Sequence, residues 1–399
     1  MSLAIEAVRS HFPALEEGAA HFDAPGGTLA PAIVAQAVAD TLASAVNQRG
    51  TFTVADRRTT EVVRQARLAM ADLLGADPAG VVFGRSMTQL TFDFARTLAK
   101  TWGLGDEIVV SRLDHDANIR PWIYAAESAG ATVRWVEFDP TTSELTADDV
   151  EAQLSDRTRL AAITAASNLI GTRPPITQIA QKVHARGALL YVDGVHNTAH
   201  AFVDVAEMGA DFYACSPYKF CGPHVGVVVA SPALLETLDP DKLLPSANTV
   251  PERFELGTPS WELMAGTTAA VDFLAGLAGP SDAPRRARLR AAFAAMGEHE
   301  EALRRVLEAG LAEHPRITVY SRARVRTPTL LFTVDGMESS EVSARLGEVN
   351  INVPASNFYA IEASRHLGLG DAGGIRVGLA PYSSAEDVER LLEALRGII

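Results

Sequence analysis

The chain has 399 residues, a length typical of two or three domains with a sizeable buried core. Hydrophobic residues make up 47% and charged residues 21%, as in ordinary globular proteins, and the net charge of -14 argues against nucleic acids and anionic membranes as partners. No apolar run approaches the roughly 18 residues of a membrane-spanning helix, and the amino terminus carries Glu6, Arg9 and Glu16 where a signal peptide would be apolar.

The first part of the chain predicts a turn-rich loop followed by two helices. Residues 21–28 contain adjacent glycines that would let a ligand approach the backbone closely, although the same residues suit a plain connector. The first helix is predicted to begin near Pro31, a good first-turn residue. Its expected inward face consists of Val34, Val38, Leu42 and Ala45. A second helix is predicted at 60–74.

Strands alternate with helices from about residue 81 to residue 231. Short apolar runs bounded by turn residues predict the strands, because parallel strands are buried on both faces. This alternation is typical of a mainly parallel sheet covered by helices on both sides. The predicted strands lie at 81–83, 107–111, 132–138, 160–166, 188–192, 211–215 and 225–230.

The strand at 81–83 is followed by small polar residues and a helix that continues to Lys100. Free amides at a helix amino terminus are a general design for binding phosphate. The segment matches neither a Walker nor a Rossmann fingerprint, and Thr88 could equally serve as a helix cap.

Polar residues also follow the other predicted strands, and ligands of such sheets gather at the carboxyl ends of the strands. His115 could instead be a solvated loop histidine, and metal binding is disfavoured because no second histidine lies at ligand spacing. We expect one cleft to receive Thr88, His115, Asn168, Asp193 and Ser216.

Two successive strand ends carry a carboxylate and a lysine. The apolar run at 188–192 ends on Asp193, and residues 211–215 lead to Lys219. Pyridoxal 5'-phosphate (PLP) needs a lysine amine for a Schiff base and an acidic residue that keeps its ring nitrogen protonated. The pair therefore favours PLP, although a surface lysine beside a helix-capping Asp would give the same local sequence. The other lysines, none of which follows a buried strand, are Lys100, Lys182 and Lys242.

A Gly- and Pro-rich break at 276–284 predicts a domain boundary. We expect an amino-terminal segment at 1–22 that packs with the small domain, a large domain at 23–275 and a small α+β domain at 285–399. The small domain should contain strands near 317–320, 329–334 and 375–379. Its last helix should begin at a capping box formed by Ser383 and Glu386.

Three motifs resemble those of a known family. They are Val192-Asp193-Gly194-x-His196, Ser216-x-x-Lys219 followed by Gly222-Pro223, and Arg253-Phe254-Glu255-x-Gly257-Thr258-Pro259. Over nearly its whole length the chain resembles fold-type I PLP enzymes of aminotransferase class V, in the cysteine-desulfurase-like branch. The resemblance implies an α/β fold, with a large PLP-binding domain around a mainly parallel seven-stranded sheet and a smaller α+β carboxyl-terminal domain.

The resemblance also implies roles for matching residues. Lys219 would form the Schiff base and move the substrate's α-proton, Asp193 would pair with the pyridine nitrogen, and His115 would stack on the ring. Arg376 would hold a substrate carboxylate with its bidentate fork. Thr258 would reach the phosphate of the neighbouring subunit's cofactor, so a homodimer is implied. The other expected cofactor-binding residues are Asn168 and His196 near the ring hydroxyl, Thr88, the Met87 backbone and Ser216 at the phosphate, and Tyr218 beside the lysine.

The chain departs from cysteine desulfurases at several positions. Desulfurases commonly have Gln where His196 stands and His where Tyr218 stands. They also carry a sulfur-accepting cysteine in a loop of the carboxyl-terminal half, whereas the matching residues 351–360 contain none. The two cysteines, Cys215 and Cys221, flank Lys219 and are expected to be reduced thiols of a cytoplasmic protein. The chain therefore resembles a subgroup that lacks the persulfide cysteine.

These observations predict a PLP-dependent enzyme that acts on a small α-amino acid. Residue identities do not separate transamination, epimerisation and β-elimination, because all three share one carbanion. An aminotransferase without persulfide chemistry is the first expectation, and a β-lyase for C–S or C–Se bonds or an amino-acid epimerase is the alternative. A PLP-binding protein without turnover is a further alternative, which the intact Lys219, Asp193 and Arg376 disfavour.

Overall fold

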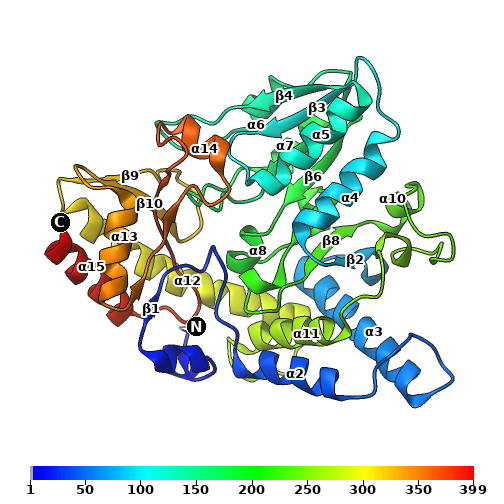
Figure 1. Cartoon of the computed structure of the whole chain (residues 1–399), viewed down its shortest axis with the longest axis horizontal. Helices are drawn as coiled ribbons and strands as arrows, with labels where there is room; N and C mark the ends of the chain where they lie inside the picture. Colours follow the sequence, from blue (N-terminus) through cyan, green and yellow to red (C-terminus); the bar gives the residue numbers. More distant parts are fainter. Residues whose placement is uncertain (1–2) are drawn as a thin grey trace.

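The computed structural model describes residues 3–399 and contains a large and a small sheet with their covering helices (Figure 1). Residues 1 and 2, which belong to the predicted amino-terminal segment, lie outside the described residues. The large sheet has seven strands, mostly parallel, and the small sheet has four antiparallel strands. The predicted α/β fold class is therefore confirmed. No helix within residues 3–399 is long and apolar enough to cross a bilayer.

The large sheet has the strand order β2-β8-β7-β6-β5-β3-β4. The pairs β3/β4, β3/β5, β5/β6 and β6/β7 are parallel, whereas β8 is antiparallel to both β7 and β2. The strands are β2 (Val81–Gly84), β3 (Glu107–Ser111), β4 (Thr132–Val136), β5 (Thr158–Thr164), β6 (Leu189–Asp193), β7 (Phe212–Cys215) and β8 (Gly226–Ala230).

Both faces of the large sheet are buried in separate apolar clusters. On β6, Leu190 and Val192 pack on one side, and Tyr191 packs on the other. Side chains alternate along a strand, so an uninterrupted apolar run places apolar groups on both faces. The first face is covered by α3 (Val54–Leu74), α7 (Ile176–His184) and α11 (Trp261–Gly276), and the second by α4 (Met87–Ala99) and α5 (Arg120–Ala129).

Three helix predictions differ from the structure. Helix α3 begins at Val54, six residues before its predicted start, because Thr53 and Asp56 form a capping box there. Helix α2 (Ala32–Ala43) buries Val34, but Leu42 is 68% exposed and Ala45 lies beyond the last turn. Helix α15 (Ala385–Ile398) is capped by Ser384 and Asp387, not by the predicted pair one residue earlier. The Ser383 hydroxyl instead accepts a hydrogen bond from the Ala380 amide at 3.0 Å.

The small domain is built on a sheet of order β12-β13-β10-β9. Helices α13 (Ser339–Glu348) and α15 contribute to its apolar core, and α14 (Ile361–His366) lies nearer the large domain (Figure 1). The strands are β9 (Ile317–Val319), β10 (Thr329–Val334), β12 (Ala355–Ser356) and β13 (Gly374–Gly378).

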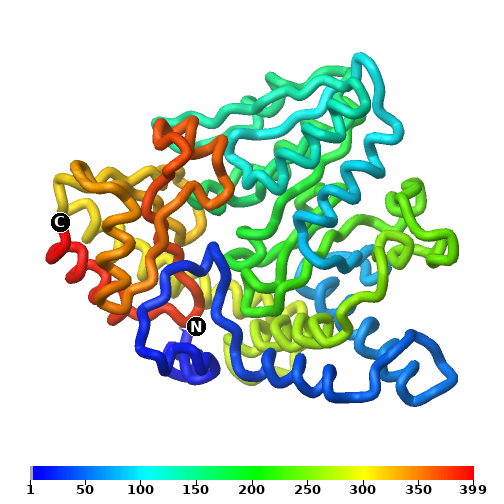
Figure 2. The backbone as a smooth tube through the Cα atoms, in the orientation of Figure 1, coloured from blue at the N-terminus to red at the C-terminus, as the bar shows by residue number. Residues whose placement is uncertain are grey.

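The amino-terminal residues lie beside the small domain before the chain enters the large one (Figure 2). Strand β1 (Ala20–His21) pairs in parallel with β11 (Ile351–Asn352). Helix α1 (Ile5–Arg9) ends in Arg9, whose guanidinium donates to the Tyr382 carbonyl at 2.6 Å and to Asp387 at 2.7 Å.

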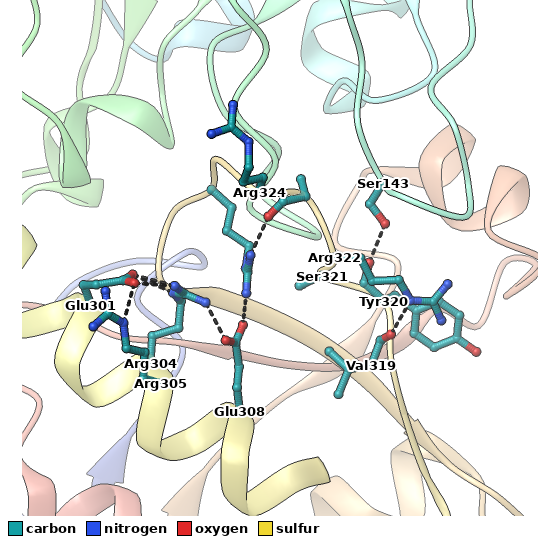
Figure 3. A network of polar contacts seen from close by, with 12 residues as sticks. Ser143, Glu301, Arg304, Arg305, Glu308, Val319, Tyr320, Ser321, Arg322 and Arg324 are labelled. Carbon is teal, nitrogen blue, oxygen red and sulfur yellow. Dashed lines mark hydrogen bonds and ion pairs between the residues drawn. The ribbon is translucent and has the colours of Figure 1, made fainter.

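The long helix α12 (Arg285–Ala312) follows the Gly- and Pro-rich break and spans both domains. Its residues Leu289 and Phe293 pack in the large-domain core, whereas Leu307 packs in the small-domain core. Near its carboxyl end, Arg304 lies between Glu301 and Glu308, at 2.6 Å and 2.5 Å (Figure 3). Beside this network the hydroxyl of Ser143, from the large domain, donates to the Tyr320 carbonyl of the small domain at 2.6 Å (Figure 3).

Candidate active site

A cavity of about 710 Å³ lies where the carboxyl ends of the large-sheet strands face the small domain. Every residue predicted for the site lines this cavity except Thr258. The predicted residues in its wall are Met87, Thr88, His115, Asn168, Asp193, His196, Ser216, Tyr218, Lys219 and Arg376. The strand order of the large sheet brings together all of them except Arg376, which comes from β13 of the small domain, and their individual roles stay predictions.

Lys219 ends the short 3-10 turn η4 (Pro217–Lys219) that follows β7. Its ammonium group donates to the carbonyls of Pro25 and Gly26 at 2.5 Å and 2.9 Å, and it lies 4.6 Å from the centroid of the Tyr218 ring. Burial, followed by the nearby charge of Arg376, lowers the pKa of Lys219 to about 7. A lysine with this pKa can exchange a proton near neutral pH.

Asp193 is the last residue of β6 and is only 4% exposed. Its Oδ1 accepts a hydrogen bond from the Val195 amide at 2.9 Å. Burial raises the pKa of this carboxyl to about 6, although the amide and the charge of Lys219 act in the opposite direction. A cationic partner at this position would stabilise the carboxylate form.

His115 follows β3 and caps the short turn η3 (Asp116–Asn118). Its Nδ1 accepts a hydrogen bond from the Ala117 amide at 3.0 Å, so the proton of the neutral ring lies on Nε2. Burial lowers the pKa of His115 to about 3, with smaller contributions from Lys219 and Arg376. The ring is therefore uncharged at neutral pH.

His196 is buried and connects the large domain to the small one. Its Nε2 lies 2.9 Å from the hydroxyls of both Thr327 and Thr329. Burial holds the pKa of His196 well below its usual range. The neighbouring Asn168 donates to the Phe358 carbonyl at 3.0 Å, while its buried Oδ1 has no partner within residues 3–399.

The amino terminus of α4 forms one end of the cavity. Ser86 caps the helix by accepting from the Gln89 amide at 3.1 Å, so the alternative assignment of Thr88 as the cap is wrong. Ser86, Met87 and Thr88 all line the cavity. Gly226 on β8 permits this placement, because a Cβ there would clash with the Ser86 carbonyl carbon and the Met87 amide nitrogen.

Arg376, on β13, is only 1% exposed and is held from several sides. Its Nη2 donates to Oδ1 of Asp23 at 2.6 Å, and its Nη1 donates to the Asn168 carbonyl at 3.1 Å. The ring of Phe358 covers the guanidinium, with the centroid 3.6 Å from Cζ. Within residues 3–399, Nε has no hydrogen-bond partner.

Thr258 and the two cysteines lie apart from this arrangement. Thr258 is exposed in the loop before α11 and does not line the cavity, so its predicted contact with a second subunit's cofactor stays a prediction. Cys215 and Cys221 are buried, and burial raises the pKa of both thiols, to about 12 at Cys221.

Several residues of the cavity wall are not among those predicted from the sequence. The glycines of loop 21–28 suggested a close backbone approach, but Asp23, which pairs with Arg376, was not recognised. Phe358 and Tyr359 were seen only as part of a segment without cysteine. Both have left-handed backbones, with φ of 53° and 60°, and the Tyr359 ring stacks on His115 with centroids 5.6 Å apart. No local pattern identifies such a conformation in non-glycine residues.

Comparisons with known proteins agree with this geometry. The model of the aminotransferase class-V family matches residues 20–391. The chain belongs to this family. The chain is 33% identical to an uncharacterized protein of Mycobacterium tuberculosis, in an alignment that covers 100% of both chains. It is also 33% identical to an aminotransferase-like protein of Gibberella zeae, in an alignment that covers 100% of this chain and 99% of the relative. A solved cysteine desulfurase of Escherichia coli is 26% identical, with a TM-score of 0.87 over 100% of this chain and 98% of its own.

Class V aminotransferases use PLP, so the predicted cofactor is confirmed for this family member. The cavity residues fit this group. The amino terminus of α4, with Ser86 and Thr88, suits a phosphate. The buried carboxylate of Asp193 suits a protonated ring nitrogen, and the amine of Lys219 suits an aldehyde. The unpartnered Oδ1 of Asn168 supplies a further polar contact inside the cavity.

Proposed function

We propose that this class V protein is a PLP-dependent enzyme that acts on a small α-amino acid, as a homodimer in the cytoplasm. The observation that carries the proposal is the convergence on one cavity of Lys219, Asp193 and Arg376, which come from two strand ends of the large sheet and from the small domain. A protein that only bound PLP would not need a buried guanidinium beside the reactive lysine.

Each of these side chains has a distinct task in the proposed reaction. PLP, when bound, supplies an electron sink for negative charge that develops at the substrate's α-carbon. Lys219 would hold the cofactor through Nζ. Once the substrate's own amine had displaced Nζ from the cofactor, Nζ would take the α-proton, a task suited to its pKa of about 7. Asp193 keeps the ring nitrogen protonated. Arg376 orients the substrate by its α-carboxylate.

We propose that the reaction forms no persulfide on the protein. A desulfurase needs an accessible thiolate, and Cys215 and Cys221 are both buried with raised pKa values. We place transamination first. The lyase and epimerase alternatives use the same three residues, so the products must decide between them.

The proposed dimer would complete the site with Thr258 from the second subunit. The segment before Thr258 exposes apolar side chains, with Leu243 at 70%, Leu244 at 96% and Leu256 at 45% exposure. A second copy that covered these side chains would remove apolar surface from water. This surface supports the proposal.

The function is tested by adding a panel of α-amino acids to the PLP-loaded protein and recording the absorption spectrum of the cofactor. Products are assayed as keto acid, sulfide or inverted amino acid. We expect at least one amino acid to change the spectrum and to give a product. Borohydride reduction and peptide mapping should place the pyridoxyl group on Lys219. A pyridoxyl group on Lys100, Lys182 or Lys242, or a cofactor unaffected by the whole panel, would refute the proposal.

A further inference from the structure

The guanidinium of Arg376, the proposed carboxylate site, is already paired with a carboxylate of the same chain. Asp23 accepts from Nη2 at 2.6 Å, and the Asn168 carbonyl accepts from Nη1 at 3.1 Å. Guanidinium has five N–H donors, and these two contacts leave others for a ligand. Asp23 also lines the cavity, and its side chain remains 32% exposed. A substrate bound by Arg376 must therefore lie close to the negative charge of Asp23.

The position of Asp23 is fixed by the surrounding backbone. Asp23 forms a bridge with Gly378 on β13, and the Gly378 amide donates to the Phe22 carbonyl at 2.7 Å. Gly378 allows this contact, because a Cβ there would clash with Pro25. Gly26 in turn leaves room for the Asp23 carboxylate, which a Cβ at residue 26 would strike. Asp23 and Arg376 thus lie on adjoining stretches of backbone, and their pairing does not depend on a flexible surface loop.

The other arginine of the cavity wall is also neutralised. Arg120 contacts Asp116 at 2.9 Å and Glu362 at 2.5 Å. The wall therefore contains three acidic side chains, Asp23, Asp116 and Asp193, against Arg120, Arg376 and the reactive Lys219. A substrate with a second carboxylate would find no unpaired arginine for it. It would also meet Asp23 beside the arginine that holds its first carboxylate.

We infer that Asp23 determines substrate specificity by charge: the site accepts α-amino acids with a single carboxylate and excludes those with an acidic side chain. The inference rests on the proposed function, because it takes Arg376 as the α-carboxylate site. Asp23 acts by like-charge repulsion inside a partly buried cavity, where the effective dielectric is below that of water. An uncharged side chain of the same size escapes this repulsion.

The test compares L-asparagine with L-aspartate, which differ in one group of nearly equal size. Their dissociation constants for the PLP-loaded protein are measured from the spectral change of the cofactor. We expect the wild-type protein to bind L-asparagine about tenfold or more tightly than L-aspartate, as expected for one unfavourable charge pair at intermediate dielectric. Equal binding of the two by the wild-type protein would overturn the inference without any variant.

The variant Asp23→Asn removes the charge and keeps an oxygen that can accept from Arg376. We expect the preference for L-asparagine to fall about tenfold, chiefly through tighter binding of L-aspartate. Asp371→Asn is the matched control, because Asp371 pairs with Arg365 at 2.6 Å on the same domain but does not line the cavity. The control should keep the wild-type preference. An unchanged preference in folded Asp23→Asn would overturn the inference.

Arg376→Gln separates failure of the inference from failure of the proposed function. If Arg376 holds the α-carboxylate, this variant weakens the binding of both amino acids to a similar degree. Weakened binding in Arg376→Gln together with an unchanged preference in Asp23→Asn would reject Asp23 alone. A wild-type cofactor spectrum that responds to neither amino acid nor to the wider panel would reject the proposed function and the inference together.

Discussion

At Lys219, His115 and Asp193, burial is the main cause of each pKa shift, and each shift favours the uncharged form. The pKa falls to about 7 at the lysine and to about 3 at the histidine, and it rises to about 6 at the aspartate. For Lys219 and Asp193, the opposite charges nearby only partly offset the effect of burial. A bound ligand with a cationic ring nitrogen would supply a counter-charge for the aspartate.

In the cofactor-free protein, Lys219 should make the free energy of unfolding rise with pH from about 7 towards the usual lysine value of 10.5. In this interval the folded chain has released a proton that the unfolded chain still binds, so stability increases with pH, whereas below it both states are protonated. In this interval the free energy of unfolding of the wild-type protein should rise by up to about 1.4 kcal/mol per pH unit more than that of Lys219→Met. Urea unfolding of both proteins across the interval measures this, and parallel pH profiles would contradict it.

The double variant Cys215→Ser/Cys221→Ser should retain the reaction with the true substrate. Both thiols are buried, and burial raises their pKa values, so neither supplies an accessible thiolate. Turnover of the double variant and mass spectrometry of the wild-type protein after exposure to L-cysteine provide the measurements. A persulfide trapped on either residue, together with lost turnover in the double variant, would restore the desulfurase interpretation.

At the scale of the elements, the amino terminus of α4 packs closely against β8 because Gly226 on β8 has no side chain. Gly226→Ala should push the helix amino terminus out of place, because the new Cβ would clash with the backbone of Ser86 and Met87. We expect the affinity of the cofactor-free protein for PLP to fall by about tenfold or more, as the helix amides no longer reach the phosphate.

Titration of the cofactor-free Gly226→Ala protein with PLP measures this affinity. Gly347→Ala on α13 is a suitable control, because a Cβ there meets no atom within 4 Å. The control should bind PLP as the wild type does. Unchanged PLP binding by a folded Gly226→Ala protein would show that the phosphate does not lie at this helix end.

The elements that the sequence predicted well are those with a strong local pattern. The apolar run ending at Asp193 predicted β6 because burial on both faces leaves no polar positions, and the i, i+3, i+4, i+7 spacing from Ile176 to Val183 predicted α7. The reversed direction of β8 has no such pattern, since antiparallel and parallel strands have similar composition when both faces are buried. The cap of α15 was misplaced because Ser383 and Ser384 both precede an acidic residue at cap spacing.

For the whole molecule, strand ends explain why most of the candidate residues lie in one cavity, whereas contacts between distant segments have no local pattern in the sequence. Strand order alone brings Asp193 and Lys219 to one edge of the sheet. The pairing of Asp23 with Arg376, 353 positions apart, depends on how the two domains pack, which periodicity does not record. The same limit explains why Phe358 was not recognised as the cover of the guanidinium.

The assembly is expected to be a homodimer in which Thr258 contributes to the site of the second subunit. Sedimentation velocity of the PLP-loaded protein should give a mass of two chains at concentrations where turnover is measured. Thr258→Ala should weaken PLP binding without changing the spectrum of the internally bound form, because only a remote phosphate contact is lost. A monomer that retains full turnover would rule out this arrangement.

The pairing of β1 with β11 has a consequence for the order of synthesis on the ribosome. Ala20 and His21 are synthesised before the large domain, and their partners Ile351 and Asn352 are synthesised after it. Strand β1 therefore has no strand partner during the synthesis of the seven strands of the large sheet. Asp23 lies two residues after β1, and Arg376 is synthesised after all seven strands of the large sheet. The ion pair between Asp23 and Arg376 can therefore form only after every strand of the large sheet has been made.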